Sequence, residues 1–497
     1  MILIKDAQVI DGMGTMPKRS DILIKGDRIS AVGTVHVKSA EHIVDAKGAY
    51  VAPGFIDVNT DSDHYLTLFT NPSHKNFLQQ GITSIIGGQC GSSLAPLLDG
   101  KLDSIRKWAD PNEINVDWQT VKEFLAFIKK QTLGVNFGTL IGHSTIRRTL
   151  IGDELRDLTE NELTAFKQIV AEAMEEGALG ISTGLGYAHA HETPYAEIHA
   201  LAEIVKKYNG VYATHIRNET TGMITSIEET IKIASNTGIK TEILHFRPLK
   251  GFEKEYLLSL ERIAEAAKEA DITFDIYPFS TSIIPIYTLL PSWAKVGTLE
   301  VMIKNSKTPY VRERILKELP EIKDKDIMVI YAPGTNSFPG KWLEQIAADC
   351  ECNLKEALLK LMEMTEMRAV VSVNNINEEV TIQTLSHPQA IISTNSPSLI
   401  DPPEFFKHDR AYATIPKFLS LVEKKNLMPI ETAVQKITSI PAKKYAIQNR
   451  GVIKQGFYAD LCIFKRGIIS DVFVNGEHVV SGQEFQRIQA GRIIKRA

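Results

Sequence analysis

Residues 240–277 decide the fold and read KTEILHFRPLKGFEKEYLLSLERIAEAAKEADITFDIY. The two apolar segments 240–244 and 273–277 flank a longer segment, 258–269, in which apolar residues recur every three or four positions. Short apolar runs are typical of buried β-strands, and the longer periodic pattern is typical of an amphipathic helix. The stretch therefore predicts a strand–helix–strand unit of the kind that builds parallel sheets.

The same alternation of apolar segments and amphipathic helices extends from residue 54 to residue 393, with another helix predicted over residues 160–175. The eight predicted strands are residues 54–58, 83–87, 136–141, 178–182, 211–214, 240–244, 273–277 and 390–393. Apolar strands separated by helices indicate a parallel sheet that is covered on both faces. Eight of them in series favour an α/β fold of the closed (β/α)8 TIM-barrel type over an open sheet.

Both ends of the chain carry short strands that alternate in polarity and are separated by turns. Neither end has enough strands to bury a core alone, so we expect residues 1–53 and 440–497 to combine into one small β-domain. The barrel domain then spans residues 54–439. Within it, residues 278–368 are too many for one barrel loop and contain helical patterns of their own, which predicts an inserted α-rich subdomain beside the barrel mouth.

The composition is that of an ordinary soluble globular protein, with 497 residues of which 43% are hydrophobic and 23% charged. A net charge of −4 and a pI near 6.4 predict no nucleic-acid partner and no attraction to anionic membranes. No apolar run reaches the roughly 18 residues of a membrane-spanning helix. The first residues lack the layout of a signal peptide, so we expect a cytoplasmic protein.

Metal-binding side chains follow three of the predicted strands. Cys90 comes after the second strand, His215 after the fifth and His245 after the sixth. Barrel enzymes place their active sites at these strand ends, and a thiol with two imidazoles is a donor set that zinc accepts. Taken singly, each residue is also consistent with a structural role. Together the three could converge on one ion and leave a fourth position open, as in catalytic zinc sites.

Seven segments spread over nearly the whole chain carry a family resemblance. They are VAPGFID (51–57), GGQCGSSLAP (87–96), GALGISTGL (177–185), THIRNE (214–219), YPF (277–279), YATIP (412–416) and GFYADL (456–461). They are similar to segments of the D-aminoacylases and N-acyl-D-glutamate deacylases, which belong to the amidohydrolase superfamily. The resemblance implies an amidohydrolase-type barrel and a hydrolase of N-acyl-D-amino acids, which acts on carbon–nitrogen bonds other than peptide bonds.

The resemblance also implies roles for individual residues. In the family, a cysteine and two histidines hold the tightly bound zinc ion, and Cys90, His215 and His245 match them. One tightly bound zinc ion is therefore expected. The arginine that anchors the substrate carboxylate matches Arg410, because a guanidinium group binds a carboxylate through two hydrogen bonds. A surface ion pair is the alternative role for Arg410.

Other residues match the substrate pocket of the family. Tyr187, Arg247 and Tyr277 fall where the family lines this pocket, and Arg247 replaces the usual lysine. His143, after the third strand, is a further candidate for substrate binding. A small-molecule N-acyl amino acid or related amide is thus the expected partner.

The chain departs from the family at two strand ends. The first strand of the family ends in His-x-His, which supplies a second, weaker metal position, whereas this chain has Asn59-Thr60-Asp61. The eighth strand of the family ends in an aspartate that serves as metal ligand and general acid/base, and Asn395 stands there. An amide cannot take up and return a proton at neutral pH, and losing positioned proton transfer typically costs about 10²- to 10⁴-fold in rate.

Asp61 is the best replacement for the missing base. Because Asn59 and Asp61 are two positions apart on one strand, both side chains are expected on the same side, where Asp61 approaches the vacant metal position. A solvated loop acid is the alternative role for Asp61. Weaker candidates are Asp63, His64 and His143, and the pair His189 and His191 is expected to be incidental.

Three functions remain open from the sequence. The first is a mononuclear zinc amidohydrolase in which Asp61 moves the proton. The second is a catalytically disabled barrel that binds an acyl-amino acid or a partner protein. The third is a repurposed barrel with cyclase or lyase chemistry, which needs Lewis acidity but no attacking water. The intact set of Cys90, His215 and His245 favours an enzyme, whereas the changes at Asn59, Asp61 and Asn395 favour altered or absent hydrolysis.

Overall fold

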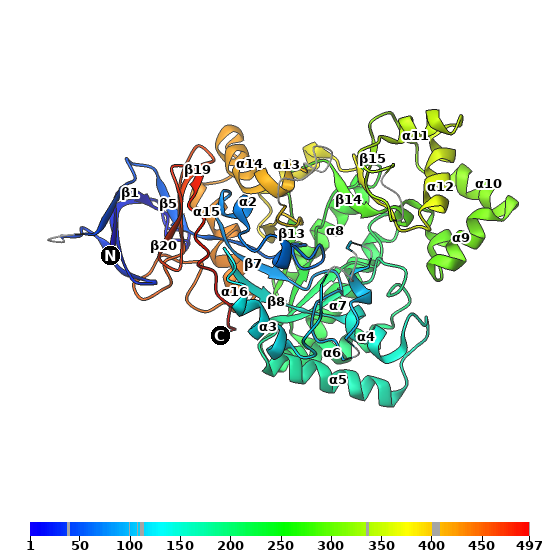
Figure 1. Ribbon diagram of the computed structural model, residues 1–497, viewed down its shortest axis with the longest axis horizontal. Helices are drawn as coiled ribbons and strands as arrows, with labels where there is room; N and C mark the ends of the chain where they lie inside the picture. Colours follow the sequence, from blue (N-terminus) through cyan, green and yellow to red (C-terminus); the bar gives the residue numbers. More distant parts are fainter. Residues whose placement is uncertain are drawn as a thin grey trace.

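Eight parallel strands form a barrel at the centre of the computed structural model (Figure 1). The structure describes residues 1–36, 40–98, 100–106, 108–109, 114–333, 337–399 and 408–496. The barrel strands are β6 (Phe55–Asp57), β7 (Ile82–Gly87), β8 (Asn136–Thr139) with its continuation β9 (Ile141–Gly142), β10 (Gly180–Gly184), β11 (Val211–His215), β12 (Lys240–Ile243), β13 (Ile272–Ile276) and β17 (Ala390–Ile392). Each strand pairs in parallel with the next.

Backbone contacts close this ring at two junctions. Leu140 alone separates β8 from β9, so the third barrel strand takes part in both sheets. At the other junction, Thr60 and Ser396 form a parallel bridge, and the Asn395 N–H donates to the Asn59 carbonyl at 2.8 Å. The predicted (β/α)8 fold is therefore confirmed.

Helices surround the barrel. They are α3 (Val121–Lys130), α4 (His143–Ile151), α5 (Glu160–Glu175), α6 (Tyr195–Lys207), α7 (Met223–Thr237), α8 (Glu253–Ala266), α13 (Glu378–Thr384), α14 (Arg410–Lys425), α15 (Ile430–Lys436) and α16 (Ser439–Lys444), with the short α1 (Thr67–Thr70) and α2 (Lys75–Leu78) near the first strands. Helix α5 begins where predicted, because Thr159 and Glu162 form a capping box there. Among the described residues, no helix combines the length and apolar character that crossing a membrane requires.

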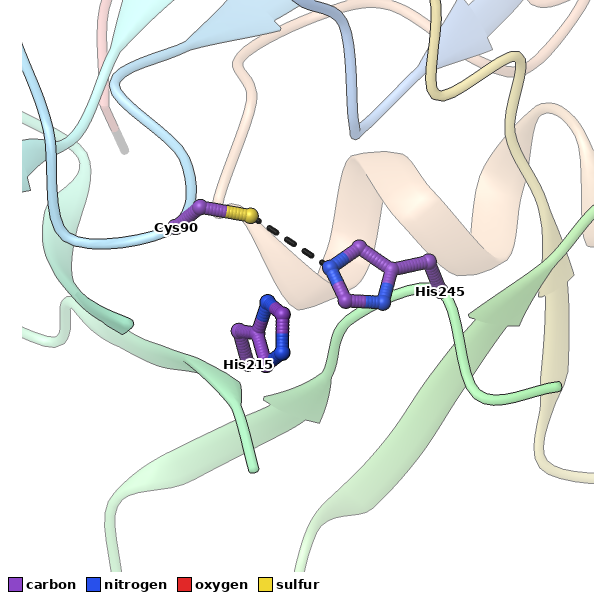
Figure 2. A group of neighbouring side chains, drawn as sticks. All are labelled: Cys90, His215 and His245. Carbon is purple, nitrogen blue, oxygen red and sulfur yellow. Dashed lines mark hydrogen bonds between the residues drawn. The ribbon is translucent and has the colours of Figure 1, made fainter. Parts of the chain in front are cut away.

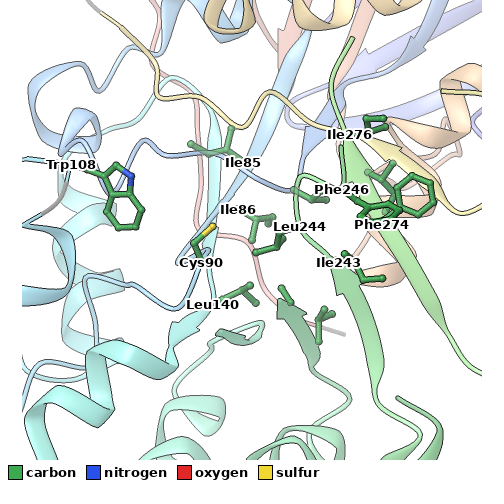
Figure 3. Packing of buried hydrophobic residues seen from close by; sticks show 14 of the residues in the cluster. Ile85, Ile86, Cys90, Trp108, Leu140, Ile243, Leu244, Phe246, Phe274 and Ile276 are labelled. Atoms are coloured by element: carbon green, nitrogen blue, oxygen red, sulfur yellow. The ribbon is translucent and has the colours of Figure 1, made fainter. Parts of the chain in front are cut away.

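The barrel strands and the elements packed around them share one continuous cluster of buried apolar side chains. Ile85 and Ile86 of β7 belong to the same buried cluster as Phe274 of β13 (Figure 3). Cys90 also belongs to this cluster and is 3% exposed. Burial of the strands on both faces explains why they stand out in the sequence as nearly continuous apolar runs.

Strands from the two ends of the chain share one sheet of nine strands. They are β1 (Ile2–Val9), β2 (Lys18–Lys25), β3 (Arg28–Gly33), β4 (His42–Asp45), β5 (Tyr50–Pro53), β18 (Leu461–Lys465), β19 (Ile468–Val474), β20 (Glu477–Ser481) and β21 (Glu484–Phe485). The two ends meet where β5 pairs antiparallel with β18. The predicted composite β-domain is confirmed, and it lies to one side of the barrel in Figure 1.

The insertion lies on the other side of the barrel (Figure 1). Its helices are α9 (Leu299–Lys307), α10 (Pro309–Glu318), α11 (Leu343–Asp349) and α12 (Leu354–Met364), as the predicted α-rich subdomain requires. It also contains an antiparallel sheet that the sequence analysis missed, with β14 (Ser282–Pro285), β15 (Ile327–Tyr331) and β16 (Val370–Val373). The central strand β16 lies beyond residue 368. The residues at which the domains and the insertion divide stay a prediction.

A buried ionic network joins the β-domain to the base of the barrel. Asp460, which is 4% exposed, forms an ion pair with Arg450 and accepts hydrogen bonds from the Asn475 N–H at 2.7 Å and from Asn136 Nδ2 at 3.1 Å. Asn136 lies on barrel strand β8, so one carboxylate holds groups from both domains. Removing the charge of Asp460 takes from the buried Arg450 guanidinium group the carboxylate with which it pairs.

We expect Asp460→Asn to lower the free energy of unfolding by about 3–5 kcal/mol, the usual cost of breaking a buried ion pair from one side. Chemical unfolding monitored by circular dichroism measures it. The matched control is Asp153→Asn, which breaks the exposed pairs of Asp153 with Arg148 and Arg106 and should cost less than about 1 kcal/mol. Equal effects of the two substitutions would contradict the structural role of Asp460.

Candidate active site

A cavity of about 710 Å³ lies at the carboxyl ends of the barrel strands. Its lining includes Cys90 after β7, His215 at the end of β11, His245 after β12 and Asn395 after β17. The insertion contributes half-buried apolar side chains to the wall, among them Ile284 of β14. The volume falls within the range of about 300–1,000 Å³ that is usual for small-molecule sites.

Cys90, His215 and His245 converge in this cavity, as Figure 2 shows. The Cys90 Sγ lies 3.4 Å from His245 Nε2, the two imidazole rings are 4.5 Å apart between centroids, and one potential ligand atom of each residue lies within 4.8 Å of the others. Zinc–sulfur and zinc–nitrogen bonds of about 2.3 and 2.1 Å at a tetrahedral angle separate sulfur from nitrogen by about 3.5 Å. The cluster therefore fits a metal ion of the zinc type.

The backbone places two of these ligands through unusual conformations. Cys90 has φ 53° and His245 has φ 36°, both in the left-handed region. Before Cys90 the chain turns at Gly88, where a Cβ atom would stand 2.1 Å from the Leu140 carbonyl oxygen, so only glycine fits. After β12, Asp275 accepts the His245 N–H at 2.9 Å and holds that turn. Backbone strain of this kind is typical of functional sites.

Glu219 lies beside both histidines and was missed as a site residue by the sequence analysis. Its carboxylate is 3.6 Å from His215 Nε2 and 3.7 Å from His245 Nδ1, and it accepts two hydrogen bonds from Arg247, at 3.2 and 2.8 Å. A carboxylate next to metal-binding imidazoles fixes the orientation of the rings and raises their basicity. Its spacing of four residues after His215 was the signal that could have revealed it.

Opposed charges set the electrostatics of the cluster. Burial raises the pKa of Glu219, but the Arg247 and His215 charges outweigh it and hold the pKa well below its usual range. Burial likewise lowers the pKa of His245, whereas the Cys90 sulfur and Glu219 raise it more strongly, to about 10. The site therefore favours positive charge between Cys90 and Glu219, where a cation would bind.

Arg410 lines the same cavity and has unused donors. It is the first residue of α14 and is 2% exposed, and its Nε and Nη1 have no hydrogen-bond partner among the described residues. Its guanidinium carbon lies 4.4 Å from the centre of the Tyr277 ring. A buried guanidinium group with free donors facing a cavity is suited to a carboxylate ligand.

The other predicted pocket residues divide into two groups. Tyr187 and Arg247 line the cavity. Tyr277 stands behind it, within 3.4 Å of Arg247 Nη1 through its hydroxyl. Burial raises the pKa of Tyr277, but the charges of Arg410 and Arg247 dominate and lower it. Tyr277 therefore contacts both arginines without lining the cavity itself, Arg247 through its hydroxyl and Arg410 through its ring.

His143 is not brought to the cavity. It begins α4, where its Nε2 lies 2.7 Å from Glu197 Oε1 and its ring stacks on Phe166. The predicted substrate contact of His143 has no geometric support, because the side chain is fully buried in this separate cluster. His191 lines the cavity, with Nδ1 3.3 Å from the Leu185 carbonyl oxygen.

Asn59, Asp61 and Asn395 stand where the resemblance places the second metal position, and their side chains do not all reach the cavity. Asn59 Nδ2 donates to both oxygens of Asp275, at 3.2 and 3.1 Å, inside the barrel, whereas Asp61 lines the cavity. The expectation that both share one side of a strand does not hold, because β6 ends at Asp57. Asn395 lines the cavity as predicted, with φ 43°.

Comparisons with known proteins agree with this geometry. The family described as "Amidohydrolase family" matches residues 42–277. A D-aminoacylase of Alcaligenes xylosoxydans xylosoxydans is 27% identical over 100% of this chain and 97% of its own. A solved D-aminoacylase structure has a TM-score of 0.83 at 25% identity and covers 100% of this chain and 99% of that one. Its description reports a binuclear metal centre with one-metal activation and second-metal attenuation. The N-acyl-D-glutamate deacylase of Bordetella bronchiseptica, solved with zinc and a phosphonate inhibitor, has a TM-score of 0.82 at 25% identity over 99% of both chains.

We expect Glu219→Gln to weaken zinc binding by about 10- to 100-fold, because the neutral amide no longer supports the two imidazoles. Competition with a chelator measures the dissociation constant. Glu229→Gln is the matched control, since Glu229 pairs in the same manner with Arg217 but does not line the cavity. Unchanged affinity in Glu219→Gln would remove Glu219 from the site.

Proposed function

We propose that the chain, a hydrolase of the amidohydrolase type that acts on carbon–nitrogen bonds other than peptide bonds, cleaves N-acyl-D-amino acids or related amides with a single zinc ion. The observation that carries this proposal is the pairing of two features in one cavity. One is the buried cluster of Cys90, His215 and His245. The other is the guanidinium group of Arg410, whose Nε and Nη1 have no hydrogen-bond partner among the described residues. An N-acyl amino acid presents an amide carbonyl to the first and a carboxylate to the second.

Each side chain has a defined part in this reaction. Cys90, His215 and His245 would hold a zinc ion, which would supply Lewis acidity to the amide carbonyl and to the attacking water. Arg410 binds the substrate carboxylate through two hydrogen bonds and so orients the amide. Asp61 takes the proton of the water and returns it to the departing nitrogen, a step that Asn395 cannot perform.

The cavity also indicates the size of the substrate. Its volume of about 710 Å³ exceeds what an N-acetyl amino acid fills, and apolar side chains of the insertion, Ile283, Ile284 and Leu289, form part of the wall. Apolar walls with a few placed polar groups are typical of sites that bury most of a ligand. A substrate with a bulky apolar acyl group or side chain fits this cavity best.

The metal prediction concerns stoichiometry. We expect the purified protein to contain about one zinc ion per chain and Cys90→Ser to lose it, because two imidazoles alone hold zinc weakly. Metal analysis by mass spectrometry measures the content, and Cys350→Ser, in the insertion, should retain the metal. Zinc-free wild-type protein would argue against the proposed centre. Zinc-loaded protein that turns over no D- or L-acyl amino acid would instead favour the disabled barrel.

The substrate prediction concerns the carboxylate. We expect Arg410→Lys to raise KM by about 10- to 100-fold with little change in kcat, because an ammonium group cannot form the bidentate pair. Steady-state kinetics with an N-acyl-D-amino acid measures this change. The control is the same substrate with its carboxylate converted to an amide, on which wild type and variant should not differ. A KM difference that persists with the amide would place Arg410 elsewhere in the mechanism.

A further inference from the structure

His64 is fully buried behind the cavity wall, three residues after Asp61. Its Nδ1 lies 3.2 Å from Asp61 Oδ1, and its Nε2 lies 3.1 Å from the Ser92 carbonyl oxygen. A backbone carbonyl only accepts hydrogen bonds, so Nε2 carries a hydrogen. An ionised carboxylate also only accepts, so Nδ1 carries a second one. This geometry describes an imidazolium ion paired with the Asp61 carboxylate.

The surroundings of His64 also favour a positive charge. The Trp108 ring stacks on the imidazole with a centroid distance of 4.1 Å and an angle of 7° between the planes. The Asp63 carboxylate lies 4.0 Å from Nε2. The carboxylates that face His64 are those of Asp61 and Asp63. Burial lowers the pKa of His64, but these negative groups outweigh it and raise the pKa to about 9.

Asp61 has its other side turned to the cavity. Its side chain is 14% exposed and lines the cavity together with Cys90 and Asn395. Its Oδ1 is bound to His64, whereas Oδ2 has no hydrogen-bond partner among the described residues. One carboxylate oxygen is therefore fixed by a buried cation and the other remains open to a reacting group.

We propose that His64 is a positioning residue that stays protonated throughout the reaction and holds Asp61 as an ionised carboxylate with one oxygen in the cavity. This inference rests on the proposed hydrolysis. The O–H bond of water breaks as its proton moves to Asp61, and the water oxygen forms a bond to the amide carbon. The C–N bond then breaks as Asp61 passes that proton to the nitrogen, which releases a carboxylic acid and an amine. Asp61 returns to its starting state, and His64 keeps both of its hydrogens.

The protonation state can be measured without turnover. In zinc-loaded protein labelled with nitrogen-15 in its histidine rings, His64→Gln identifies the His64 signals by their disappearance. We expect both ring nitrogens of His64 to be protonated at pH 7 and to titrate above the usual range of an imidazole. A neutral imidazole at pH 7 would overturn the inference. Because the spectrum requires no substrate, its result holds even if the proposed hydrolysis fails.

A pH profile separates positioning from a merely structural role. His64→Asn keeps a donor for Asp61 but removes the positive charge. The alkaline limb of the kcat profile that loss of the His64 proton causes in the wild type should vanish, and kcat at pH 7 should fall by about 10- to 100-fold with little change in KM. A uniform loss of kcat at every pH would contradict the inference.

Two further variants complete the test. His199→Asn replaces a half-buried histidine of α6 and should leave the profile unchanged. Asp61→Asn removes the carboxylate that holds the second hydrogen, so His64 should titrate at lower pH in the nitrogen-15 spectrum. That measurement remains possible if His64→Asn does not fold. An unchanged His64 titration in Asp61→Asn would overturn the pairing.

Discussion

The buried carboxylate of Asp275 holds together the part of the barrel on which the site depends. It accepts hydrogen bonds from the His245 N–H after β12, from Ser393 Oγ after β17 and from Asn59 Nδ2 after β6. Burial raises its pKa, and these donors act against that rise. The backbone hydrogen bonds of a parallel sheet join only neighbouring strands. The Asp275 side chain, near the end of β13, adds hydrogen bonds to three segments at once and so fixes both the closure of the barrel and the position of His245.

This constraint also explains why Asn59 is compatible with the fold. Asp275 needs donors, and an amide supplies them without competing for a metal ion. Asp57 serves the same junction by accepting the Thr394 N–H at 3.2 Å and its hydroxyl at 2.5 Å. The first and eighth strands are thus joined by carboxylates beneath the cavity, and the cluster of Cys90, His215 and His245 at the mouth comes from other strands.

Local sequence patterns were enough to predict the barrel and the convergence of Cys90, His215 and His245. Barrel strands such as β7 are buried on both faces, so each appears as an apolar run, and the order of strands alone brings their ends to one rim. The contacts that no single segment encodes were not predictable. The strands of the insertion are short and pair only with one another, and the direction of Asn59 depends on Asp275, 216 residues away. His143 follows a strand like a site residue, yet Glu197 draws it into a separate cluster.

Arg247 and Arg410 both line the cavity, but only Arg247 forms an ion pair with a carboxylate among the described residues. The Arg247 guanidinium group pairs with the Glu219 carboxylate, which also lies beside His215 and His245. The positive charge of Arg247 is therefore neutralised within this cluster. Arg410 lies over the face of Tyr277, and its Nε and Nη1 have no hydrogen-bond partner among the described residues. Burying an unpaired charge is costly, and the cost is recovered when an anion arrives. A ligand without an anionic group leaves this cost in place, so the cavity favours a ligand that carries a carboxylate or a similar anion.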